Sequence, residues 1–190
     1  MVSMFIVFEG IDGSGKSSVI QRLKEDLEAS GRKVMVTAEP TGNTVGKFVA
    51  ETDGLSPEAE ALLFTADRAI HTDEVKGWMA DGYTVICDRY FGSTLAYQSA
   101  AGMDIGWLKA INSKVTIRPD VTILMDIDPE VSLKRVSERG ETSRFEKLEY
   151  LRKVREAYLS AGKEFGFVTV DADRDRDTVA KDVISIVRGI

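Results

Sequence analysis

The chain has 190 residues, of which 43% are hydrophobic and 29% are charged, and its formal net charge is −6. This length supports one domain with a substantial core, and the apolar runs are far shorter than the ~20 residues that a membrane-spanning helix needs. The acidic balance disfavours a general nucleic-acid binder. The single cysteine excludes an internal disulfide, and no signal-peptide pattern opens the chain. We therefore expect a cytoplasmic protein.

A strand, a glycine-rich turn and a helix form the first predicted unit. Residues 5–8 are a continuous apolar run, and Gly10, Gly15, Lys16 and Ser17 after it match the phosphate-loop pattern G-x-x-x-x-G-K-[ST]. Glycines let backbone N–H groups surround a phosphate, Lys16 can reach the β- and γ-phosphates, and Ser17 can bind Mg²⁺. A glycine turn that fits by chance is the alternative. The strand–turn–helix context favours ATP binding by Gly10, Ile11, Asp12, Gly13, Ser14, Gly15, Lys16, Ser17 and Ser18.

A strand at 34–36, a loop at 38–43 and a long helix at 57–80 follow. The apolar side of this helix is expected to contain Leu62, Leu63, Ala66, Ala69, Ile70 and Val75. Phe64 and Arg68 lie four residues apart and share a face, so they could present a ring and a cation to an aromatic anion. Without further context, these two residues favour an exposed arginine that packs on a phenylalanine.

The third predicted strand ends just before Asp88 and Arg89. A carboxylate at the end of a buried strand, downstream of a phosphate loop, can hold Mg²⁺ or its water shell, and an arginine beside it suits a phosphate. A helix-capping aspartate with a surface arginine is the alternative, but the phosphate loop favours the functional interpretation. Ser93, Tyr97 and Gln98 follow, and their hydroxyl, phenol and amide groups suit the edge of a nucleobase.

A polar segment at 138–146 lies between two predicted helices and contains Arg139 and Arg144, with Arg135 one turn earlier. In a phosphoryl-transfer enzyme this segment would be a lid whose arginines neutralise charge in the transition state, with Arg135 near the ATP. In any other protein it would be a solvated loop. Asp128, upstream of it, is interpreted as a helix N-cap rather than as a metal ligand.

Five predicted strands alternate with helices, at residues 5–8, 34–36, 83–87, 121–125 and 167–170. Further helices are expected at 103–116, from about 145 onwards and at 179–187. The alternation predicts an α/β fold in which a five-stranded parallel sheet is flanked by helices, the three-layer P-loop NTPase architecture. We expect a single domain over 1–190 with a short lid at about 138–147.

The order of the motifs FEGIDGSGKSS, EPTG, LLFTADR, DRYFGSTLAYQ and ERGETSRFE resembles thymidylate kinase over about residues 4–160. The phosphate loop alone implies only a nucleotide, whereas the DRY…S…AYQ block is specific. The resemblance implies an enzyme that transfers the γ-phosphoryl group of ATP to dTMP, with Mg²⁺ as cofactor and dTDP as product. It also implies a homodimer with ATP and dTMP as its small-molecule partners and no nucleic-acid or membrane partner.

The resemblance further implies the roles of side chains in the acceptor site. Phe64 would stack on thymine, and Arg68 would contact its edge. Arg89 would clamp the acceptor phosphate, and Asp12 would face the 3′-hydroxyl. Tyr97 would pack where a ribose 2′-hydroxyl would fall, which favours deoxyribose. The full set implied for dTMP is Asp12, Pro40, Phe64, Arg68, Arg89, Ser93, Tyr97 and Gln98.

Catalysis is expected to use positioning and electrostatics alone, because a phosphate oxygen is already ionised at neutral pH and needs no general base. No basic residue occupies positions 11–14, so the transition-state arginine should come from the lid. Ala38 stands where many family members have an arginine, so no role is carried over to it. The expected catalytic residues are Lys16, Asp88, Arg89, Arg139 and Arg144, with Ser17 and Asp88 at the metal.

Other functional classes fit the residues less well. A kinase for another small acceptor is the nearest alternative. A GTP-dependent switch needs the guanine-reading pattern N-K-x-D, which residues 112–115 do not match. An idle nucleotide-binding subunit would not need the whole set Lys16, Ser17, Asp88 and Arg89. The only histidine, His71, has no suitable serine motif nearby and is interpreted as a surface or interface residue.

Overall fold

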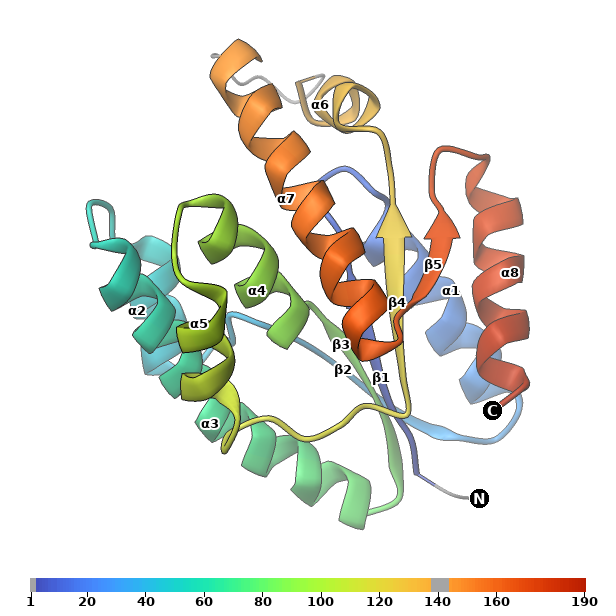
Figure 1. Cartoon of the computed structure of the whole chain (residues 1–190). Helices are drawn as coiled ribbons and strands as arrows, with labels where there is room; N and C mark the ends of the chain where they lie inside the picture. The colour runs from blue at the N-terminus through green and yellow to red at the C-terminus, as the bar shows by residue number, and fades with distance from the viewer. Residues whose placement is uncertain (1–2, 138–143) are drawn as a thin grey trace.

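The computed structural model describes residues 3–137 and 144–190 (Figure 1). In these ranges the strands form one five-stranded sheet in the order β2-β3-β1-β4-β5, and every neighbouring pair is parallel. The predicted α/β fold with a parallel sheet is therefore confirmed. The strands are β1 (Phe5–Glu9), β2 (Lys33–Ala38), β3 (Tyr83–Asp88), β4 (Val121–Asp126) and β5 (Val168–Asp171).

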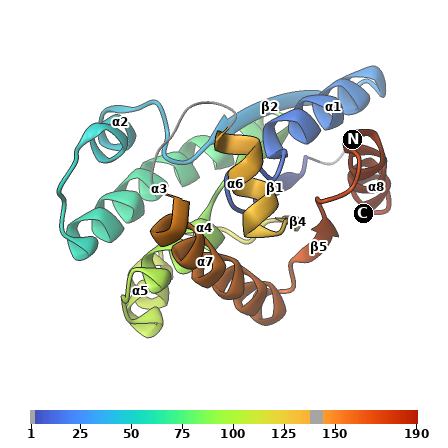
Figure 2. The ribbon, with the colours of Figure 1, turned by 90° about the horizontal axis from the view of Figure 1, so that it is seen from above.

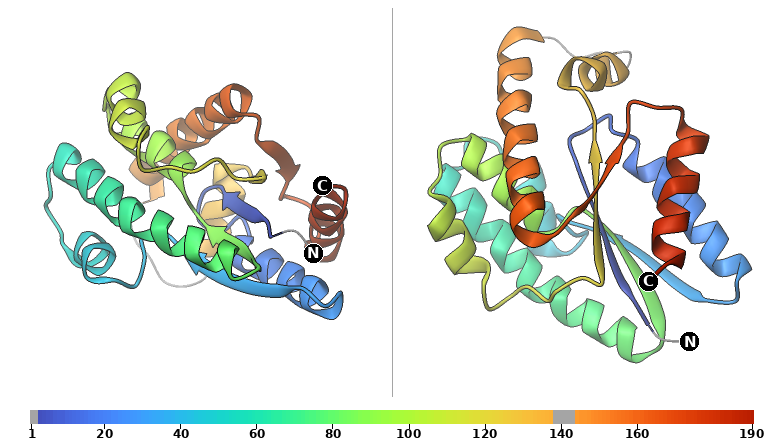
Figure 3. Two further views of the ribbon diagram at one scale, coloured as in Figure 1. Left: turned by 90° about the horizontal axis from the view of Figure 1, so that it is seen from below. Right: turned by 45° about the vertical axis from the view of Figure 1, so that its right-hand side comes forward.

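Helices cover both faces of this sheet. Helices α1 and α8 pack against each other on one face, while α3, α4 and α7 lie over the other (Figures 1 and 3). None of the described helices is both long and apolar enough to cross a lipid bilayer. Their bounds are α1 (Lys16–Ala29), α2 (Thr44–Glu51), α3 (Pro57–Ala80), α4 (Phe91–Ala100), α5 (Ile105–Asn112), α6 (Pro129–Ser137), α7 (Arg144–Phe165) and α8 (Arg176–Arg188).

Strand β1 lies at the centre of the sheet because its apolar side chains can be buried on both faces. Ile6 and Phe8 pack in the same core as residues of α1 and α8, whereas Phe5 and Val7 pack with residues of α3. The register pairs Phe8 of β1 with Asp88 of β3, so these two strands end at the same level.

The carboxyl ends of the parallel strands meet at the edge that lies uppermost in Figure 1. The phosphate loop follows β1 at this edge, the EPTG segment follows β2, and Arg89 follows β3. Figure 2 looks onto this edge and shows α3, α4, α6 and α7 arranged around it. Open parallel sheets bind their ligands at such an edge, so the fold brings the predicted motifs to one place.

The structure differs from the prediction at α2, and at α5, which is shorter than expected. Residues 44–51 form α2, which was not predicted, and Asn43 caps it by accepting a hydrogen bond from the Gly46 N–H at 2.9 Å. Helix α5 ends at Asn112 and not at Thr116. Its chain turns there because the backbone N–H groups of Val115 and Thr116 both donate to the Asn112 carbonyl oxygen.

The buried side of α3 also differs from the prediction. Leu62 and Ile70 were expected to be buried, but they are 49% and 46% exposed. The buried positions include Arg68, His71 and Thr72 instead. Polar partners on neighbouring elements, described below, explain why this face is polar.

The acidic residues at the end of β4 and just after it have structural roles, as predicted for Asp128. Its Oδ1 accepts a hydrogen bond from the Glu130 N–H at 2.8 Å at the start of α6. Asp126 accepts two hydrogen bonds from the Arg155 guanidinium, at 2.7 and 2.8 Å. These two carboxylates are therefore used by the N-cap and by an ion pair.

Candidate active site

The loop between β1 and α1 has the backbone shape of a phosphate-binding concavity. Gly10, Gly13 and Gly15 have positive φ values of 138°, 78° and 88°. A Cβ would lie 2.6 Å from the Met125 carbonyl oxygen at Gly10 and 2.8 Å from the Ser132 carbonyl oxygen at Gly13, so only glycine fits either position. Helix α1 begins directly after Gly15, which gives it no side-chain cap, so its first N–H groups can bind an anion.

The Lys16 side chain folds back over this loop. Its Nζ donates to the carbonyl oxygens of Gly10 at 2.9 Å and Ile11 at 3.3 Å. Burial lowers the pKa of Lys16 to about 8, and the charge of Arg89 acts in the same direction. A bound polyphosphate would offer Nζ an ionised acceptor and would favour its charged form.

A cavity of about 470 Å³ lies beside the loop, and most of the residues predicted for ATP line it. Ile11 and Ser14 are each only 2% exposed and lie beneath the loop, and they and Gly10 do not line the cavity. Arg176, the first residue of α8, lines it and was not predicted. The predicted residues in the lining are Asp12, Gly13, Gly15, Lys16, Ser17, Ser18 and Arg135.

Arg135 also supports the loop from α6. Its Nη1 donates to the carbonyl oxygens of Gly13 at 3.4 Å and Ala172 at 3.1 Å. Ser132, one turn earlier, donates from Oγ to the Asp12 carbonyl oxygen at 2.5 Å. The phosphate loop is therefore held by α6 as well as by its own glycines.

Ser17 and Asp88, the two residues predicted to hold a metal ion, both line this cavity and contact each other. Ser17 Oγ donates to Asp88 Oδ2 at 3.5 Å, which is a long hydrogen bond. The other oxygen, Asp88 Oδ1, is buried and has no hydrogen-bond partner among the residues that the structure describes. A buried carboxylate oxygen without a donor is costly, which suits a position that a cation completes.

A second cavity, of about 270 Å³, lies between α3, α4 and the EPTG segment. Every residue predicted for the acceptor lines it: Asp12, Pro40, Phe64, Arg68, Arg89, Ser93, Tyr97 and Gln98. Asp67 of α3 holds the EPTG segment against this cavity, because Thr41 donates to it through N–H at 2.8 Å and through Oγ1 at 2.6 Å. A larger cavity of about 680 Å³, between residues 116–122 and the end of α7, contains none of the predicted side chains.

Arg89 stands between the two substrate-sized cavities and lines both of them. Its φ of 70° is in the left-handed region, which is uncommon for a side chain of this size. Nη2 donates to Asp12 Oδ1 at 2.5 Å, and Nη1 donates to Ser93 Oγ at 3.3 Å and to the Tyr158 hydroxyl at 3.2 Å. The guanidinium also lies over the Tyr97 ring, with its carbon 5.2 Å from the ring centroid.

Glu9, at the end of β1, was not predicted, and it accepts hydrogen bonds from two of the side chains that contact Arg89. Its Oε2 accepts from Ser93 Oγ at 2.6 Å and from the Tyr158 hydroxyl at 3.1 Å, and its Oε1 accepts from the Tyr90 N–H at 3.0 Å. Burial raises the pKa of Glu9. A charged residue that ends a buried strand is the same signal that identified Asp88, and it could have identified Glu9.

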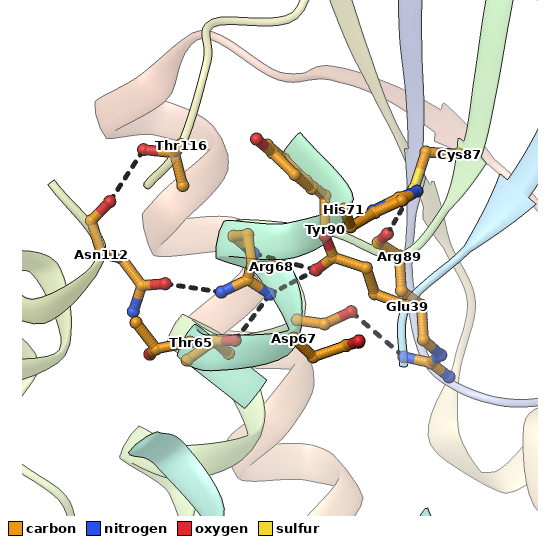
Figure 4. A network of polar contacts seen from close by, with 12 residues as sticks. Glu39, Thr65, Asp67, Arg68, His71, Cys87, Arg89, Tyr90, Asn112 and Thr116 are labelled. Carbon is orange, nitrogen blue, oxygen red and sulfur yellow. Dashed lines mark hydrogen bonds and ion pairs between the residues drawn. The ribbon is translucent and has the colours of Figure 1, made fainter. Parts of the chain in front are cut away.

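Arg68 is only 2% exposed, so the interpretation of an exposed arginine is wrong. Its Nε donates to Glu39 Oε2 at 2.9 Å, its Nη1 to Asn112 Oδ1 at 2.6 Å and its Nη2 to Thr94 Oγ1 at 3.0 Å (Figure 4). His71 is also buried, so the surface interpretation is wrong, and its ring lies between the carboxylate oxygen Oε1 of Glu39, at 2.9 Å, and the Thr37 hydroxyl on β2. Sequence reasoning missed this network because its members are far apart in the chain.

The predicted lid falls partly outside the part of the chain that the structure describes. Arg139 lies outside it. Arg144 is the first residue of α7, and nothing is described of its side chain. Their expected roles therefore stay predictions.

The parallel sheet with a phosphate loop after its central strand defines a P-loop protein, and the two cavities beside this loop share Asp12 and Arg89 in their linings. The family model described as thymidylate kinase matches residues 8–183. The chain belongs to this family, so it is a nucleoside monophosphate kinase that forms dTDP from dTMP by ATP-dependent phosphoryl transfer. The resemblance found in the sequence is thereby confirmed.

Curated relatives with the same family name match this chain over nearly their whole length. The chain is 42% identical to a probable thymidylate kinase of Pyrobaculum calidifontis, with 97% of this chain and 95% of the relative covered. It is also 42% identical to a probable thymidylate kinase of Archaeoglobus fulgidus, at 97% and 94% coverage. A third protein of this name, from Pyrococcus horikoshii, is 42% identical at 99% and 97% coverage.

Proposed function

We propose that ATP and dTMP occupy the two cavities and that the phosphoryl group moves between them at their junction. The observation that carries this proposal is that Asp12 and Arg89 line both cavities. A triphosphate on the phosphate loop would lie with its γ-phosphate toward Arg89, and an acceptor phosphate on Arg89 would face it. Donor and acceptor would then be close enough for transfer, and water would be excluded from the junction.

The chemistry needs no proton acceptor. An oxygen of the dTMP phosphate forms a bond to the γ-phosphorus, the bond from that phosphorus to the β–γ bridging oxygen breaks, and ADP leaves with the electron pair. The attacking oxygen is already ionised near neutral pH, so side chains contribute charge and position. Lys16, Arg89, Arg135 and Arg176 line the donor cavity and would offset the negative charge of both substrates.

The residues at the junction fit Mg²⁺. Ser17 and Asp88 offer oxygen ligands, and Asp88 Oδ1 has no hydrogen-bond partner in the described part of the chain. No cluster of three or more His, Cys, Asp or Glu side chains that could hold a metal occurs among the described residues. This agrees with an ion that reaches the site on ATP, because Mg²⁺ usually takes one or two protein ligands beside phosphate and water. Bound there, the ion would neutralise charge on the β- and γ-phosphates.

The base site has the polarity of thymine. Phe64 supplies an aromatic face, and Arg68 supplies N–H donors for O4 of the base. Gln98 Nε2 donates to Glu60 Oε2 at 3.0 Å, which leaves the amide oxygen as an acceptor for the N3–H of thymine. Cytosine would present an amino donor to Arg68 and an acceptor nitrogen to Gln98, so both contacts would be lost.

A lid arginine would complete the charge at the junction. Arg139 or Arg144 is proposed for this role because the phosphate loop has no basic residue at positions 11–14. An arginine that meets the transition state contributes roughly 10³ to 10⁵ in kcat. Arg139→Ala and Arg144→Ala test the assignment, and near wild-type kcat for both would contradict it.

A homodimer is proposed through the face made by α2, α3 and β2. Phe48, Leu62, Ile70 and Val36 of these elements are 52%, 49%, 46% and 41% exposed, and a second copy of the chain would remove such apolar side chains from water. Light scattering should give about twice the chain mass of 20.9 kDa. Leu62→Glu with Ile70→Glu should give the monomer, whereas Phe165→Glu, on α7, should not.

The deciding experiment is ADP release from ATP and Mg²⁺, with dTMP, dUMP, UMP, dCMP and dGMP offered in turn. Strong preference for dTMP supports the base site and the deoxyribose contact of Tyr97. Turnover with another acceptor and none with dTMP would keep the kinase fold and remove the proposed specificity.

A further inference from the structure

We infer that Asn112, on α5 and outside the lining of the acceptor cavity, is a positioning residue that aims Arg68 at the 4-position of the pyrimidine. It would thereby set the preference for a base with a 4-oxo group over one with a 4-amino group. The inference rests on the proposed placement of the base between Phe64 and Arg68.

The contacts of Asn112 define the direction of its amide. The side chain is fully buried, at 0% exposure. Its Nδ2 donates to the Leu108 carbonyl oxygen at 2.9 Å, one turn back in α5. The amide oxygen must therefore be the atom that faces Arg68, and it accepts from Nη1 at 2.6 Å (Figure 4). The reverse orientation would place amide donors against guanidinium donors.

The hydrogen bonds of Arg68 within the protein leave one of its N–H donors available for a ligand. A guanidinium has five N–H donors in a rigid plane. Nε donates to Glu39 Oε2, Nη2 donates to Thr94 and lies 2.6 Å from the same Glu39 oxygen, and Nη1 donates to Asn112. One Nη1 hydrogen is then left without a partner in the described part of the chain, and Arg68 lines the acceptor cavity.

Asn112 controls the direction of that last hydrogen. Glu39 holds the guanidinium from the β2 side and Asn112 holds it from the α5 side, so the plane cannot rotate without breaking one of the two contacts. Because a guanidinium can only donate, its Nη1 hydrogen can bind O4 of thymine or uracil but not the amino group of cytosine. Without the Asn112 oxygen, Nη1 has an unsatisfied buried donor, and the guanidinium is expected to turn away from O4 to find an acceptor.

The side chain can be changed without removing the backbone role of this position. Asn112 also ends α5, where its carbonyl oxygen accepts backbone hydrogen bonds from Val115 and Thr116. These backbone contacts do not involve the amide group. A substitution at Asn112 therefore keeps these backbone contacts and removes the two contacts of the amide, with Arg68 and with the Leu108 carbonyl oxygen.

The test compares dTMP with 4-thio-dTMP, which keeps the N3–H of the base and replaces O4 by sulfur, a much weaker hydrogen-bond acceptor. For the wild type, sulfur in place of O4 should lower kcat/KM by roughly tenfold, because most of a hydrogen bond to a charged group is lost. In Asn112→Leu the dTMP value should fall by a similar factor, while the analogue and the KM for ATP change by less than about threefold. Lys114→Leu, on the surface next to it, should behave as the wild type.

Asn112→Asp gives a second readout, because it keeps the acceptor oxygen. The O4 effect, which is the ratio of kcat/KM for dTMP to kcat/KM for the analogue, should stay within about threefold of the wild-type ratio. If Asn112→Leu does not fold, Asn112→Ala carries the same prediction.

Several outcomes would overturn the inference. It is wrong if Asn112→Leu or Asn112→Ala keeps the full O4 effect, if it lowers both acceptors equally, or if Asn112→Asp loses the effect. A wild type that uses dTMP but ignores O4 overturns the inference alone. A wild type that does not use dTMP overturns the proposed function itself.

Discussion

Binding of ATP should take up a proton above pH 8, because the Lys16 side chain is mostly neutral there in the free protein. In the free protein its Nζ is buried on two carbonyl oxygens, and burial lowers its pKa to about 8 from the ordinary 10.5. Ionised phosphates beside Nζ favour its charged form, so the pKa rises in the complex. The complex then holds more protons than the free protein, and affinity must fall as pH rises through about 8.

The size of the effect follows from that pKa. At pH 8 about half of the free protein has a neutral Lys16, so binding takes up about 0.5 proton, and at pH 9 it takes up about 0.9. Affinity should weaken by about tenfold between pH 7 and pH 9, because only the protonated fraction is competent. The phosphates of ATP contribute nothing in this range, since the second ionisation of a phosphate has a pKa of about 6.

Isothermal titration calorimetry in buffers of different ionisation enthalpy measures the protons taken up. The matched control is Lys16→Arg, which keeps the positive charge but cannot lose its proton in this range. The wild type should take up nearly one proton at pH 9, and the variant none. Equal proton numbers for the two proteins at pH 9 would refute the reasoning.

Further predictions concern residues around the junction of the two cavities. Gly92→Ala should lower the free energy of unfolding in urea by about 1–3 kcal/mol, because its Cβ would lie 2.8 Å from Glu9 Oε1. Gly42→Ala is the control and should leave this free energy unchanged, because a Cβ there meets open space. Tyr158→Phe removes a hydroxyl that contacts the acceptor arginine and should lower kcat/KM for dTMP by roughly tenfold, with the KM for ATP unchanged in steady-state kinetics. Asp88→Asn should raise the Mg²⁺ concentration that gives half-maximal rate, and an unchanged value would exclude it from the metal site.

The central strand and the phosphate loop could be predicted from the sequence because their signals are local. A strand buried on both faces needs an apolar run, and the loop needs glycines where a Cβ would collide, as at Gly10 and Gly13. Helix α2 also has a local signal in the sequence, since Asn43 caps it. Such features depend on residues that lie within a few positions of one another.

The polar side of α3 could not be predicted in this way. Periodicity assigns the apolar residues of a helix to its buried side, and on α3 this put Leu62 and Ile70 inside. The side that is buried carries Arg68 and His71, whose partner Glu39 lies 29 and 32 positions away along the chain. A buried arginine is stable only when such a partner is present, and the sequence does not say which elements will meet.

The two arginines of the acceptor site differ in how their charges are balanced, and this difference explains why one suits a base and the other a phosphate. Arg68 pairs with Glu39, whose side chain is 4% exposed, so its charge is neutralised inside the protein and it can read an uncharged carbonyl group. Arg89 pairs with Asp12, whose side chain is 74% exposed, and such a contact contributes little stability. A phosphate can therefore take the place of Asp12 on Arg89 at small cost, whereas an anion at Arg68 would have to displace a buried carboxylate.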